Sequence, residues 1–502
     1  MGPSTDWLAA RASHSPDRII LIDPGRGWTC REVNLSVARI ASQLADAGVD
    51  EGQPVALFMQ NLPESVLSLF AIQRIGAVPV LLSNRLSIAE IQERLAQTSC
   101  TLLVRQTVSS SDSFLETGGQ VRQIPIEVPH LTPEASNQPG SEVDRYLSRP
   151  VSLDETCATV FTSGSAGSPL GVQLTYSNCL WNALGSAVRL GNYPDDRWLA
   201  CLPLHHIGGL SILFRGLITG TPVILQSGFE PAAVAKAIYD QGANLVSLVP
   251  TMLHRLVTQV PESIRSAPVR FFLVGGGRVP ERLLHEALDL DLNIALTYGL
   301  TETASQVSTA TPRQTREKPG SVGRPLFFNQ VSIRAEMGES LSIGEIGEIV
   351  VAGPTVMRGY ANRNSGGGRR LNGAELYTGD LGFLDWDGDL WVTGRQDEVI
   401  NSGGEKIHPE EVEAALIQHP GVREAQAIGI EDPEWGERVA AAVVPEVDGR
   451  LAAEDLIEFL RPRIAAHKIP RKFLFMRDLP MTGSGKIDLV QIRKKLEASD
   501  GS

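Results

Sequence analysis

Apolar and polar positions follow two different periods along this chain. Short apolar runs, which are typical of buried strands, occupy residues 54–59, 77–82, 101–104, 245–249 and 271–274. Between them, apolar residues recur every three or four positions, most clearly at 36–47 and 88–97, and this spacing predicts amphipathic helices. Strands that alternate with helices in this way predict an α/β fold with largely parallel sheets.

The pattern changes character after Arg395. A tryptophan-containing apolar strand at 389–393 ends there, and the residues that follow predict a small α+β module. The elements expected in this module are helices at 409–418 and 453–463 and strands at 424–430 and 440–445. We therefore expect a large α/β domain at 1–395 and a small C-terminal domain at 396–502. Inside the large domain, the polar stretch 109–148 predicts a long irregular connection.

Composition and charge narrow the class of protein. A chain of 502 residues with 42% hydrophobic residues can bury a large core and form more than one domain. Its formal net charge of −13 argues against a nucleic-acid partner or an anionic membrane surface. Five cysteines without a Cys-x-x-Cys pair indicate neither a disulfide framework nor a zinc site. With no targeting pattern and no transmembrane run in the sequence, we expect a cytoplasmic protein.

A glycine- and serine-rich segment directly follows the apolar run 158–161. It reads Thr162-Ser163-Gly164-Ser165-Ala166-Gly167-Ser168-Pro169-Leu170-Gly171-Val172. Glycines permit tight turns, and hydroxyl and amide donors can converge on an anion, so this segment suits a phosphate group. A surface turn of the same composition is the alternative. The segment is not the Gly-x-x-x-x-Gly-Lys-Ser/Thr loop, because no lysine stands at the required distance after Gly164.

A second motif combines an aromatic ring, hydroxyls and a carboxylate at 297–303. The ring of Tyr298 can stack on a purine, the hydroxyl of Thr301 can bond a phosphate, and the carboxylate of Glu302 can hold Mg²⁺. A buried strand end would equally explain Tyr298 and Gly299.

Two further motifs lie towards the C-terminus. Asp380, in Thr378-Gly379-Asp380, can accept hydrogen bonds from both hydroxyls of a ribose, and Arg395 can contribute a second ribose or phosphate contact. A simple turn residue is the alternative for Asp380. Near the chain end, Pro480-Met481-Thr482-Gly483-Ser484-Gly485-Lys486 forms a tight loop that can present Lys486 to a cleft, although most lysines are solvated surface charges.

These motifs, in this order, resemble those of the adenylate-forming enzymes, which include the acyl-CoA synthetases. That superfamily carries Thr-Ser-Gly-Thr/Ser-Thr-Gly-x-Pro-Lys-Gly-Val, then Tyr-Gly-x-Thr-Glu, and finally Pro-x-Thr-x-x-Gly-Lys. The resemblance spans nearly the whole chain and implies a large N-terminal domain of stacked α/β subdomains plus a small, mobile α+β C-terminal domain. Leu170 departs from the pattern because the family usually has lysine there. The departure predicts weaker engagement of ATP or pyrophosphate.

The resemblance also implies a role for each matching residue. It implies ATP, Mg²⁺ and CoA as cofactor and co-substrates, and an acyl-AMP as the intermediate. Thr301 would meet the α-phosphate, Glu302 would bind Mg²⁺, and Lys486 would serve adenylation. Asp397 matches the hinge about which the small domain rotates, and Gly403 and Gly404 lie on the face that would then approach the site. The remaining residues implied in nucleotide binding are Thr162, Ser163, Gly164, Ser165, Gly167, Gly275, Gly276, Gly277, Tyr298, Gly299, Asp380 and Arg395.

A finer resemblance concerns the acyl substrate. The segments 202–210, 247–253, 298–306 and 320–326 resemble those of the 2-succinylbenzoate–CoA ligases of menaquinone and phylloquinone synthesis. His206 matches the histidine beside the acyl pocket in those enzymes, which implies a catalytic and substrate-binding role, and Ser305 falls in a matching segment. A capping or core histidine is the alternative for His206. A dicarboxylate would need a cation, for which Arg215 is a candidate, unless that side chain reaches to the surface.

Other functions stay open at this point. A CoA ligase for another aryl or fatty carboxylic acid would share every catalytic motif. A degenerate nucleotide-binding paralogue without turnover is suggested only by Leu170. An adenylation domain that serves a carrier protein is a third option, but the chain has no Asp-Ser-Leu carrier segment. The small-molecule acid, ATP and CoA are the expected partners, and the sequence leaves open whether the protein is a monomer or a homo-oligomer.

Overall fold

The computed structural model describes residues 4–106, 121–126, 142–162, 169–362, 369–402, 405–432, 435–446, 451–482 and 487–498. The chain forms two compact units. Unit 1 comprises Met1–Val331 and Val351–Leu376, and unit 2 comprises Ser332–Val350 and Tyr377–Ser502. Unit 2 therefore holds the expected C-terminal module together with a sheet that precedes it. The predicted boundary after Arg395 concerns a moving domain and stays a prediction.

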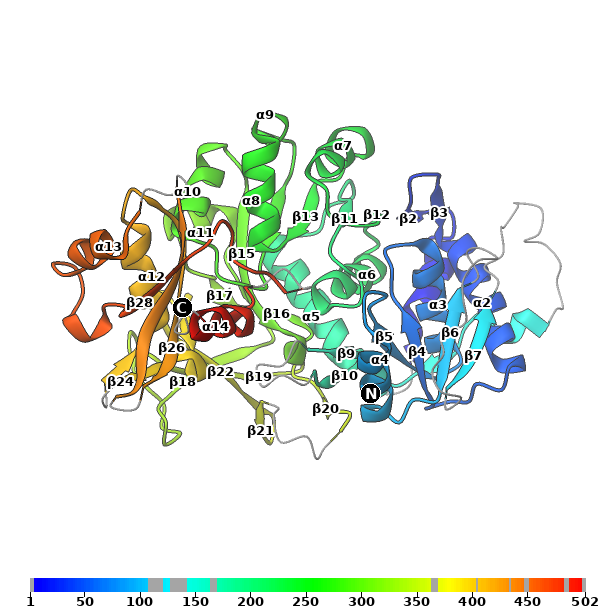
Figure 1. Ribbon diagram of the computed structural model, residues 1–502. Coiled ribbons are helices and arrows are strands. Elements are labelled where there is room, and N and C mark those ends of the chain that lie inside the picture. The colour runs from blue at the N-terminus through cyan, green and yellow to red at the C-terminus, as the bar shows by residue number, and fades with distance from the viewer. Residues whose placement is uncertain are drawn as a thin grey trace. The chain divides into compact units, whose positions relative to one another are not determined.

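The first sheet of unit 1 has seven strands in the order β20-β10-β9-β5-β4-β6-β7 (Figure 1). The strands β4 to β7 run parallel, β9 is parallel to β5, and β10 is antiparallel to both of its neighbours, β9 and β20. Their bounds are β4 Pro54–Phe58, β5 Val78–Leu82, β6 Leu102–Gln106, β7 Arg122–Ile126, β9 Thr156–Phe161, β10 Gly171–Thr175 and β20 Gly359–Tyr360.

Helices cover both faces of this sheet, which explains why its central strands β4 and β5 are apolar throughout. In β4, Val55 and Leu57 join the core with α2 (Cys30–Asp46) and α3 (Pro63–Arg74). Ala56 faces the other way and packs with α4 (Ile88–Gln97). Strands buried on both faces read as continuous apolar runs rather than as alternating ones.

The second sheet of unit 1 has nine strands in the order β17-β16-β15-β14-β13-β11-β12-β2-β3. Its central strands, from β15 to β2, are parallel, and the two edges are antiparallel. The bounds are β2 Ile19–Ile22, β3 Gly27–Thr29, β11 Trp198–Ala200, β12 Val223–Leu225, β13 Leu245–Leu248, β14 Phe271–Val274, β15 Ile294–Leu300, β16 Ser305–Thr309 and β17 Arg324–Pro325.

Helices also cover the second sheet. The helices α7, α8 and α10 pack on one face, and α6 packs on the other. The remaining elements of unit 1 are α1 Trp7–His14, α5 Tyr176–Leu190, α6 Ile207–Thr219, α7 Pro231–Gln241, α8 Pro250–Gln259, α9 Pro261–Ile264, α10 Glu281–Asp289, α11 Pro312–Glu317, β1 Ser4–Thr5, β8 Pro150–Val151, β21 Arg370–Asn372, and the 3₁₀ helices η2 Glu142–Tyr146 and η3 Thr301–Thr303.

The described residues of unit 2 form strands of two sheets. In the first, β18, β19 and β22 are neighbours and β23 pairs with β22; in the second, β25-β24-β27-β26 is extended by β28. The bounds are β18 Gln330–Arg334, β19 Gly347–Ala352, β22 Glu375–Leu384, β23 Leu390–Arg395, β24 Ile400–Ser402, β25 Glu405–Ile407, β26 Val422–Asp432, β27 Gly436–Pro445, β28 Lys472–Phe475, α12 Pro409–Ile417, α13 Ala453–Leu460, α14 Leu489–Ala498, η4 Gln396–Glu398 and η5 Ala466–Lys468.

The mixed α/β fold class is confirmed, and most expected elements lie within a few residues of their observed bounds. The helix expected at 36–47 begins earlier, at Cys30, because Thr29 and Glu32 form a capping box at its start. The stretch expected to be irregular at 109–148 contains β7 and η2, while 107–120 and 127–141 lie outside the described residues.

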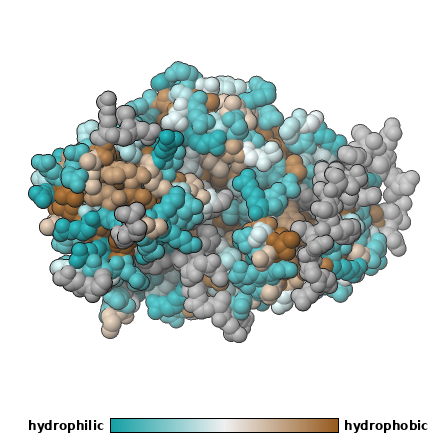
Figure 2. All heavy atoms as spheres, in the orientation of Figure 1, coloured by the Kyte–Doolittle hydropathy of each residue, from teal (hydrophilic) through white to brown (hydrophobic). Residues whose placement is uncertain are grey.

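All five cysteines are buried free thiols in unit 1: Cys30, Cys100, Cys157, Cys179 and Cys201. The sulfur atoms of Cys157 and Cys179 lie 3.3 Å apart. On the face seen in Figure 2, hydrophilic and apolar residues are interspersed over the described chain. Among the helices that the structure describes, none combines the length and apolar character that crossing a membrane requires.

Candidate nucleotide and acyl site

The motif at 297–303 forms a tight turn at the end of β15. Gly299 lies so close to the returning strand β16 that a Cβ there would stand 1.7 Å from the carbonyl oxygen of Ser305. Ala304 and Ser305 have positive φ angles of 54° and 111°, a backbone conformation that residues other than glycine rarely adopt. Between these positions η3 carries Thr301, which is half-buried, and Glu302, which is buried.

Glu302 has both a hydroxyl and a cation beside its carboxylate. The hydroxyl of Tyr360 donates to Oε1 of Glu302 at 3.0 Å, and Nε of Arg369 lies 3.4 Å from the same oxygen. Burial and the charge of Glu302 raise the pKa of Tyr360, so the phenol keeps its proton and donates. A buried carboxylate at a strand end fits Mg²⁺, which proteins commonly hold through one or two carboxylates and substrate phosphates.

The structure describes only the two ends of the predicted phosphate loop. The backbone N–H of Thr162 donates to the carbonyl of Leu170 at 3.0 Å, which closes the β9–β10 hairpin at the base of the loop. The side chain of Leu170 is buried, with 6% exposed. Ser163, Gly164, Ser165 and Gly167 lie outside the described residues, so their role in phosphate binding stays a prediction.

The three glycines after β14 lie at the carboxyl end of a parallel strand, where α/β sheets usually bind ligands. A Cβ on Gly275 would stand 2.6 Å from Cγ2 of Thr297 and 2.9 Å from its carbonyl oxygen, so only glycine fits between β14 and β15. Gly276 and Gly277 are exposed. Tyr298, on the neighbouring strand, is half-buried. This open edge beside an aromatic residue fits the predicted adenine wall.

Arg215 and Ser305, which the sequence proposed independently for the acyl substrate, are in contact. Arg215 projects from α6 and has 3% of its surface exposed. Its Nη2 donates to the hydroxyl of Ser305 at 3.2 Å and to the side-chain carbonyl of Asn182 at 3.0 Å. Its guanidinium also lies 5.3 Å from the ring centre of Trp198. Arg215 is therefore an interior side chain, and the surface alternative is wrong for it.

Arg215 is a buried cation without a countercharge in the described part of unit 1. No carboxylate forms an ion pair with it there, and its Nε has no hydrogen-bond partner. Burial alone lowers the pKa of Arg215 to about 9. Burying an unpaired charge is costly, so an anion that arrived here would be strongly favoured.

The two adjacent histidines lie at the start of α6. His206 is the N-cap residue, but its side chain makes no capping hydrogen bond to the helix. Its ring centre lies 4.3 Å from that of His205. Burial lowers the pKa of His205 to about 4, so the His205 ring is neutral near pH 7. The catalytic and substrate-binding roles of His206 stay predictions.

Unit 2 brings Asp380 and Arg395 together. They are opposite each other in the β22–β23 ladder, and Nε of Arg395 lies 3.9 Å from Oδ1 of Asp380. Asp380 is buried, and its backbone N–H is held by the hydroxyl of Thr378 at 3.1 Å. The pairing fits the predicted ribose contact. Lys486, Gly403 and Gly404 lie outside the described residues, as does the side chain of Asp397, so all four stay predictions.

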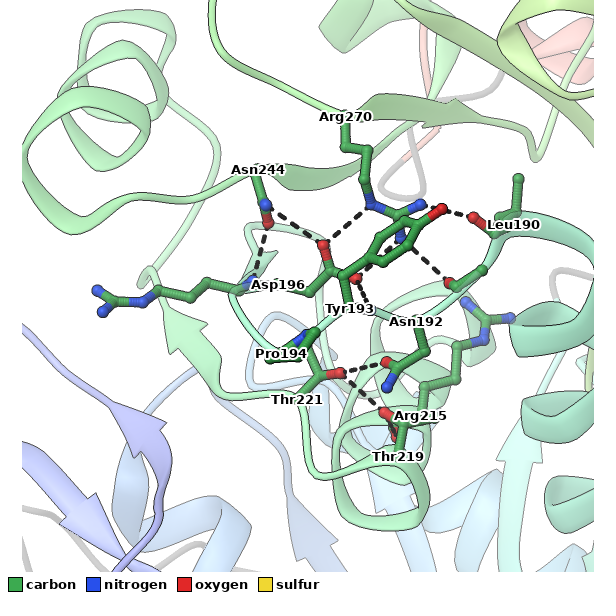
Figure 3. Close-up of polar contacts among 12 residues, drawn as sticks. Leu190, Asn192, Tyr193, Pro194, Asp196, Arg215, Thr219, Thr221, Asn244 and Arg270 are labelled. Atoms are coloured by element: carbon green, nitrogen blue, oxygen red, sulfur yellow. Dashed lines mark hydrogen bonds and ion pairs between the residues drawn. The ribbon is translucent and has the colours of Figure 1, made fainter.

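A partly buried ion pair links the end of α5 to the start of β14 (Figure 3). Arg270 donates to both carboxylate oxygens of Asp196 at 2.9 Å, and Asp196 is almost fully buried. The same guanidinium donates to the carbonyls of Leu190 at 2.6 Å and Gly191 at 3.1 Å, at the end of α5. Arg270 directly precedes β14, so this network joins α5, which follows the predicted phosphate loop, to the strand that leads to Gly275.

Sequence reasoning did not identify Asn182, Tyr360 or Arg369 as site residues. Asn182 is a buried amide on α5, and the same helix buries the polar residues Asn178 and Ser186, so no apolar pattern singled it out. Tyr360 lies 58 residues from Glu302 in the sequence, and Arg369 lies next to a glycine-rich segment. No local pattern links either residue to Glu302.

The chain matches known families over most of its length. Residues 8–361 match the AMP-binding enzyme family, and residues 411–486 match the AMP-binding enzyme C-terminal domain. It is 35% identical over 492 residues to the 2-succinylbenzoate–CoA ligase of Bacillus mycoides, covering 98% of each chain. It is 37% identical over 485 residues to the ligase of the same name from Bacillus licheniformis, covering 96% of this chain and 98% of that one.

Solved structures give the same result. The o-succinylbenzoate CoA synthetase (MenE) of Bacillus subtilis, in complex with the acyl-adenylate intermediate OSB-AMP, is 36% identical, with a TM-score of 0.86 and 99% of each chain covered. The same enzyme in complex with ATP and a magnesium ion has a TM-score of 0.85, with 99% of this chain and 100% of that chain covered. The chain is thus similar in sequence and in fold to acyl-adenylate-forming enzymes.

Proposed function

The chain belongs to the AMP-binding enzyme family, and from this premise we propose that it is an ATP-dependent ligase that joins 2-succinylbenzoate to CoA. The relatives with that name are aligned over nearly their whole length, and one related structure holds OSB-AMP. ATP, Mg²⁺ and CoA are the other reactants in this proposal. The thioester product would enter menaquinone or phylloquinone synthesis.

The observation that carries the choice of acid is the buried cation Arg215. A monocarboxylic acid uses its one carboxylate in the reaction and brings no anion for a second site. 2-Succinylbenzoate has two carboxylates, so one can react while the other pairs with Arg215 in a desolvated, charge-assisted contact. Ser305 and Asn182 hold the guanidinium in place for that contact.

In the first half-reaction, an oxygen of the reacting carboxylate attacks the α-phosphorus of ATP, and pyrophosphate leaves. Mg²⁺ held by Glu302 supplies charge stabilisation at the phosphates. The hydroxyl of Thr301 donates a hydrogen bond to the α-phosphate. Tyr298 and Gly275–Gly277 enclose the adenine. Asp380, together with Arg395, binds the ribose. Lys486 neutralises charge that develops between the carboxylate and the α-phosphate.

In the second half-reaction, the CoA thiol attacks the acyl carbon and AMP leaves. The proposal assigns Asp397 to the hinge that withdraws Lys486, and Gly403 and Gly404 to the face that replaces it. His206, at the start of α6, lies about two and a half turns before Arg215 and contacts the acyl group in this proposal. We place the reaction in the reducing cytoplasm, which suits five free thiols.

Thioester formation with a panel of acids tests the proposal. The panel contains 2-succinylbenzoate, the two analogues that each lack one of its carboxylates, and a set of aryl and fatty acids. We expect strong preference for 2-succinylbenzoate, loss of turnover in Lys486→Ala, and loss of the preference in Arg215→Gln. Turnover of a different acid would assign another pathway, and no turnover of any acid would favour a nucleotide-binding paralogue.

A further inference from the structure

Arg369 is a cation in contact with the carboxylate assigned to magnesium. Its Nε lies 3.4 Å from Oε1 of Glu302, and the two side chains are only 17% and 7% exposed. Tyr360 binds both partners. Its hydroxyl donates to Glu302 at 3.0 Å and accepts the backbone N–H of Arg369 at 2.9 Å. Without nucleotide, the negative charge of Glu302 is therefore balanced by Arg369.

This balance changes when a metal ion binds Glu302. A divalent cation repels a guanidinium that shares its ligand, and the repulsion is strong at a largely buried position. The anions that accompany the ion are the phosphate oxygens of ATP. Guanidinium groups bind phosphate oxygens through paired hydrogen bonds. Arg369 can thus exchange one anionic partner, the carboxylate of Glu302, for another, the phosphate oxygens of ATP that arrive with the metal ion.

The residue that directly precedes β10, at the end of the predicted phosphate loop, is unusual. Leu170 occupies the position at which the resembling enzymes have a lysine, and its side chain is buried. Directly after Leu170, β10 pairs with β20, and the carbonyl of Gly171 accepts the backbone N–H of Ala361 at 2.8 Å. The chain segment that carries Tyr360 therefore runs beside the strand that follows position 170.

We propose that Arg369 is a phosphate-binding residue that supplies, from a different segment, the positive charge missing at position 170. In the free enzyme it pairs with Glu302, and in the Mg·ATP complex it binds the β- and γ-phosphates. The inference rests on the proposed function only in requiring that ATP binds at Glu302. It does not depend on which acid is activated.

Binding of a non-reacting nucleotide tests this directly. Isothermal titration calorimetry would measure the affinity for the Mg²⁺ complex of α,β-methylene-ATP and, separately, for AMP, which has no β- or γ-phosphate. For Arg369→Ala we expect about tenfold weaker binding of the ATP analogue, as for the loss of a charge-assisted contact, and an AMP affinity within about twofold of wild type. Arg369→Lys should keep part of the affinity, because it keeps the charge.

Arg370→Ala is the matched control, since Arg370 is the same residue type at the next position and is exposed. It should leave both affinities unchanged. Leu170→Lys in the Arg369→Ala background should recover part of the lost affinity for the ATP analogue. Thermal unfolding of each variant shows whether it is folded.

Two results would overturn the proposal. Equal weakening of the ATP analogue and AMP in Arg369→Ala would make Arg369 a structural support for Glu302. Unchanged binding of both nucleotides would show that its guanidinium does not reach the phosphates. If the nucleotide results are as expected while the acid panel shows no activity on 2-succinylbenzoate, the phosphate role stands and only the assigned acid is wrong.

Discussion

The side-chain carbonyl of Asn182 accepts a hydrogen bond from Nη2 of Arg215 at 3.0 Å, so a neutral amide faces this buried cation where a carboxylate would neutralise it. The Nδ2 group of Asn182 meanwhile donates to the carbonyls of Thr303 at 3.3 Å and Gln306 at 2.8 Å. A single amide therefore orients the guanidinium and supports the turn that carries Ser305, while leaving the positive charge available.

Replacing this amide by a carboxylate should remove the charge selectivity. In Asn182→Asp the new anion pairs with Arg215, so KM for 2-succinylbenzoate should rise by about tenfold or more, as for loss of a charge-assisted contact. KM for an acid with one carboxylate should change much less. Steady-state thioester formation with both acids measures this. A parallel rise in both KM values would contradict a selective role for Arg215.

Adding a methyl group at Gly299 should disrupt the turn. A Cβ there would stand 1.7 Å from the carbonyl oxygen of Ser305. Because this oxygen belongs to the backbone and not to a flexible side chain, it cannot easily move away. We expect Gly299→Ala to lower the free energy of unfolding by about 3 kcal/mol and to abolish adenylation. Gly228→Ala is the control because nothing lies within 4 Å of its added Cβ. Chemical denaturation compares the two, and similar midpoints would show that the turn can relax.

Removing the carboxylate of Asp196 should be costly. Asp196→Ala leaves Arg270 without its ion-pair partner, and because Arg270 is 23% exposed the loss should fall below the cost of breaking a fully buried pair, at about 2 kcal/mol. Asp195→Ala changes an exposed carboxylate at the next position and should have little effect. The difference in unfolding free energy between these variants is the measurement. A difference below about 1 kcal/mol would mean that the carbonyls of Leu190 and Gly191 hold Arg270 without help.

Acid should destabilise the protein partly through His205. Its pKa is about 4 in the folded protein and 6.5 without perturbation, so unfolding takes up a proton between these pH values. This group therefore lowers the free energy of unfolding progressively as pH falls from about 6.5 to about 4, and contributes no slope above that window. His205→Gln should flatten this part of the curve. An unchanged slope would assign the acid sensitivity to other groups.

Much of the fold could be predicted because burial leaves a direct trace in the sequence. Strands such as β4 and β14 are apolar at every position since helices or clusters cover both faces, and α4 repeats at the helical period. The start of α2 was missed although Thr29-x-x-Glu32 is a capping pattern. The compact units could not be predicted, because β18 and β19 join β22 across an intervening stretch of chain.

The site residues came from motif resemblance rather than from single residues. Gly275 and Gly299 lie where no Cβ fits, but a glycine by itself was weak evidence, because a buried strand end explained Gly299 equally well. Arg215 lies on a helix that is apolar almost all round, so periodicity could not show whether it faces the core. The pairing of Glu302 with Arg369 depends on a tertiary contact between distant segments, which no local pattern encodes.

The burial of every cysteine has a practical consequence for work with this protein. Burial raises the pKa of the Cys100 thiol to about 11 and that of Cys201 to about 12, so these thiols react slowly with disulfide reagents while unit 1 stays folded. A colorimetric thiol reagent added while the enzyme is folded would therefore report free CoA rather than the enzyme. The same reagent would detect opening of unit 1, whereas unit 2, which has no cysteine, could unfold without any signal.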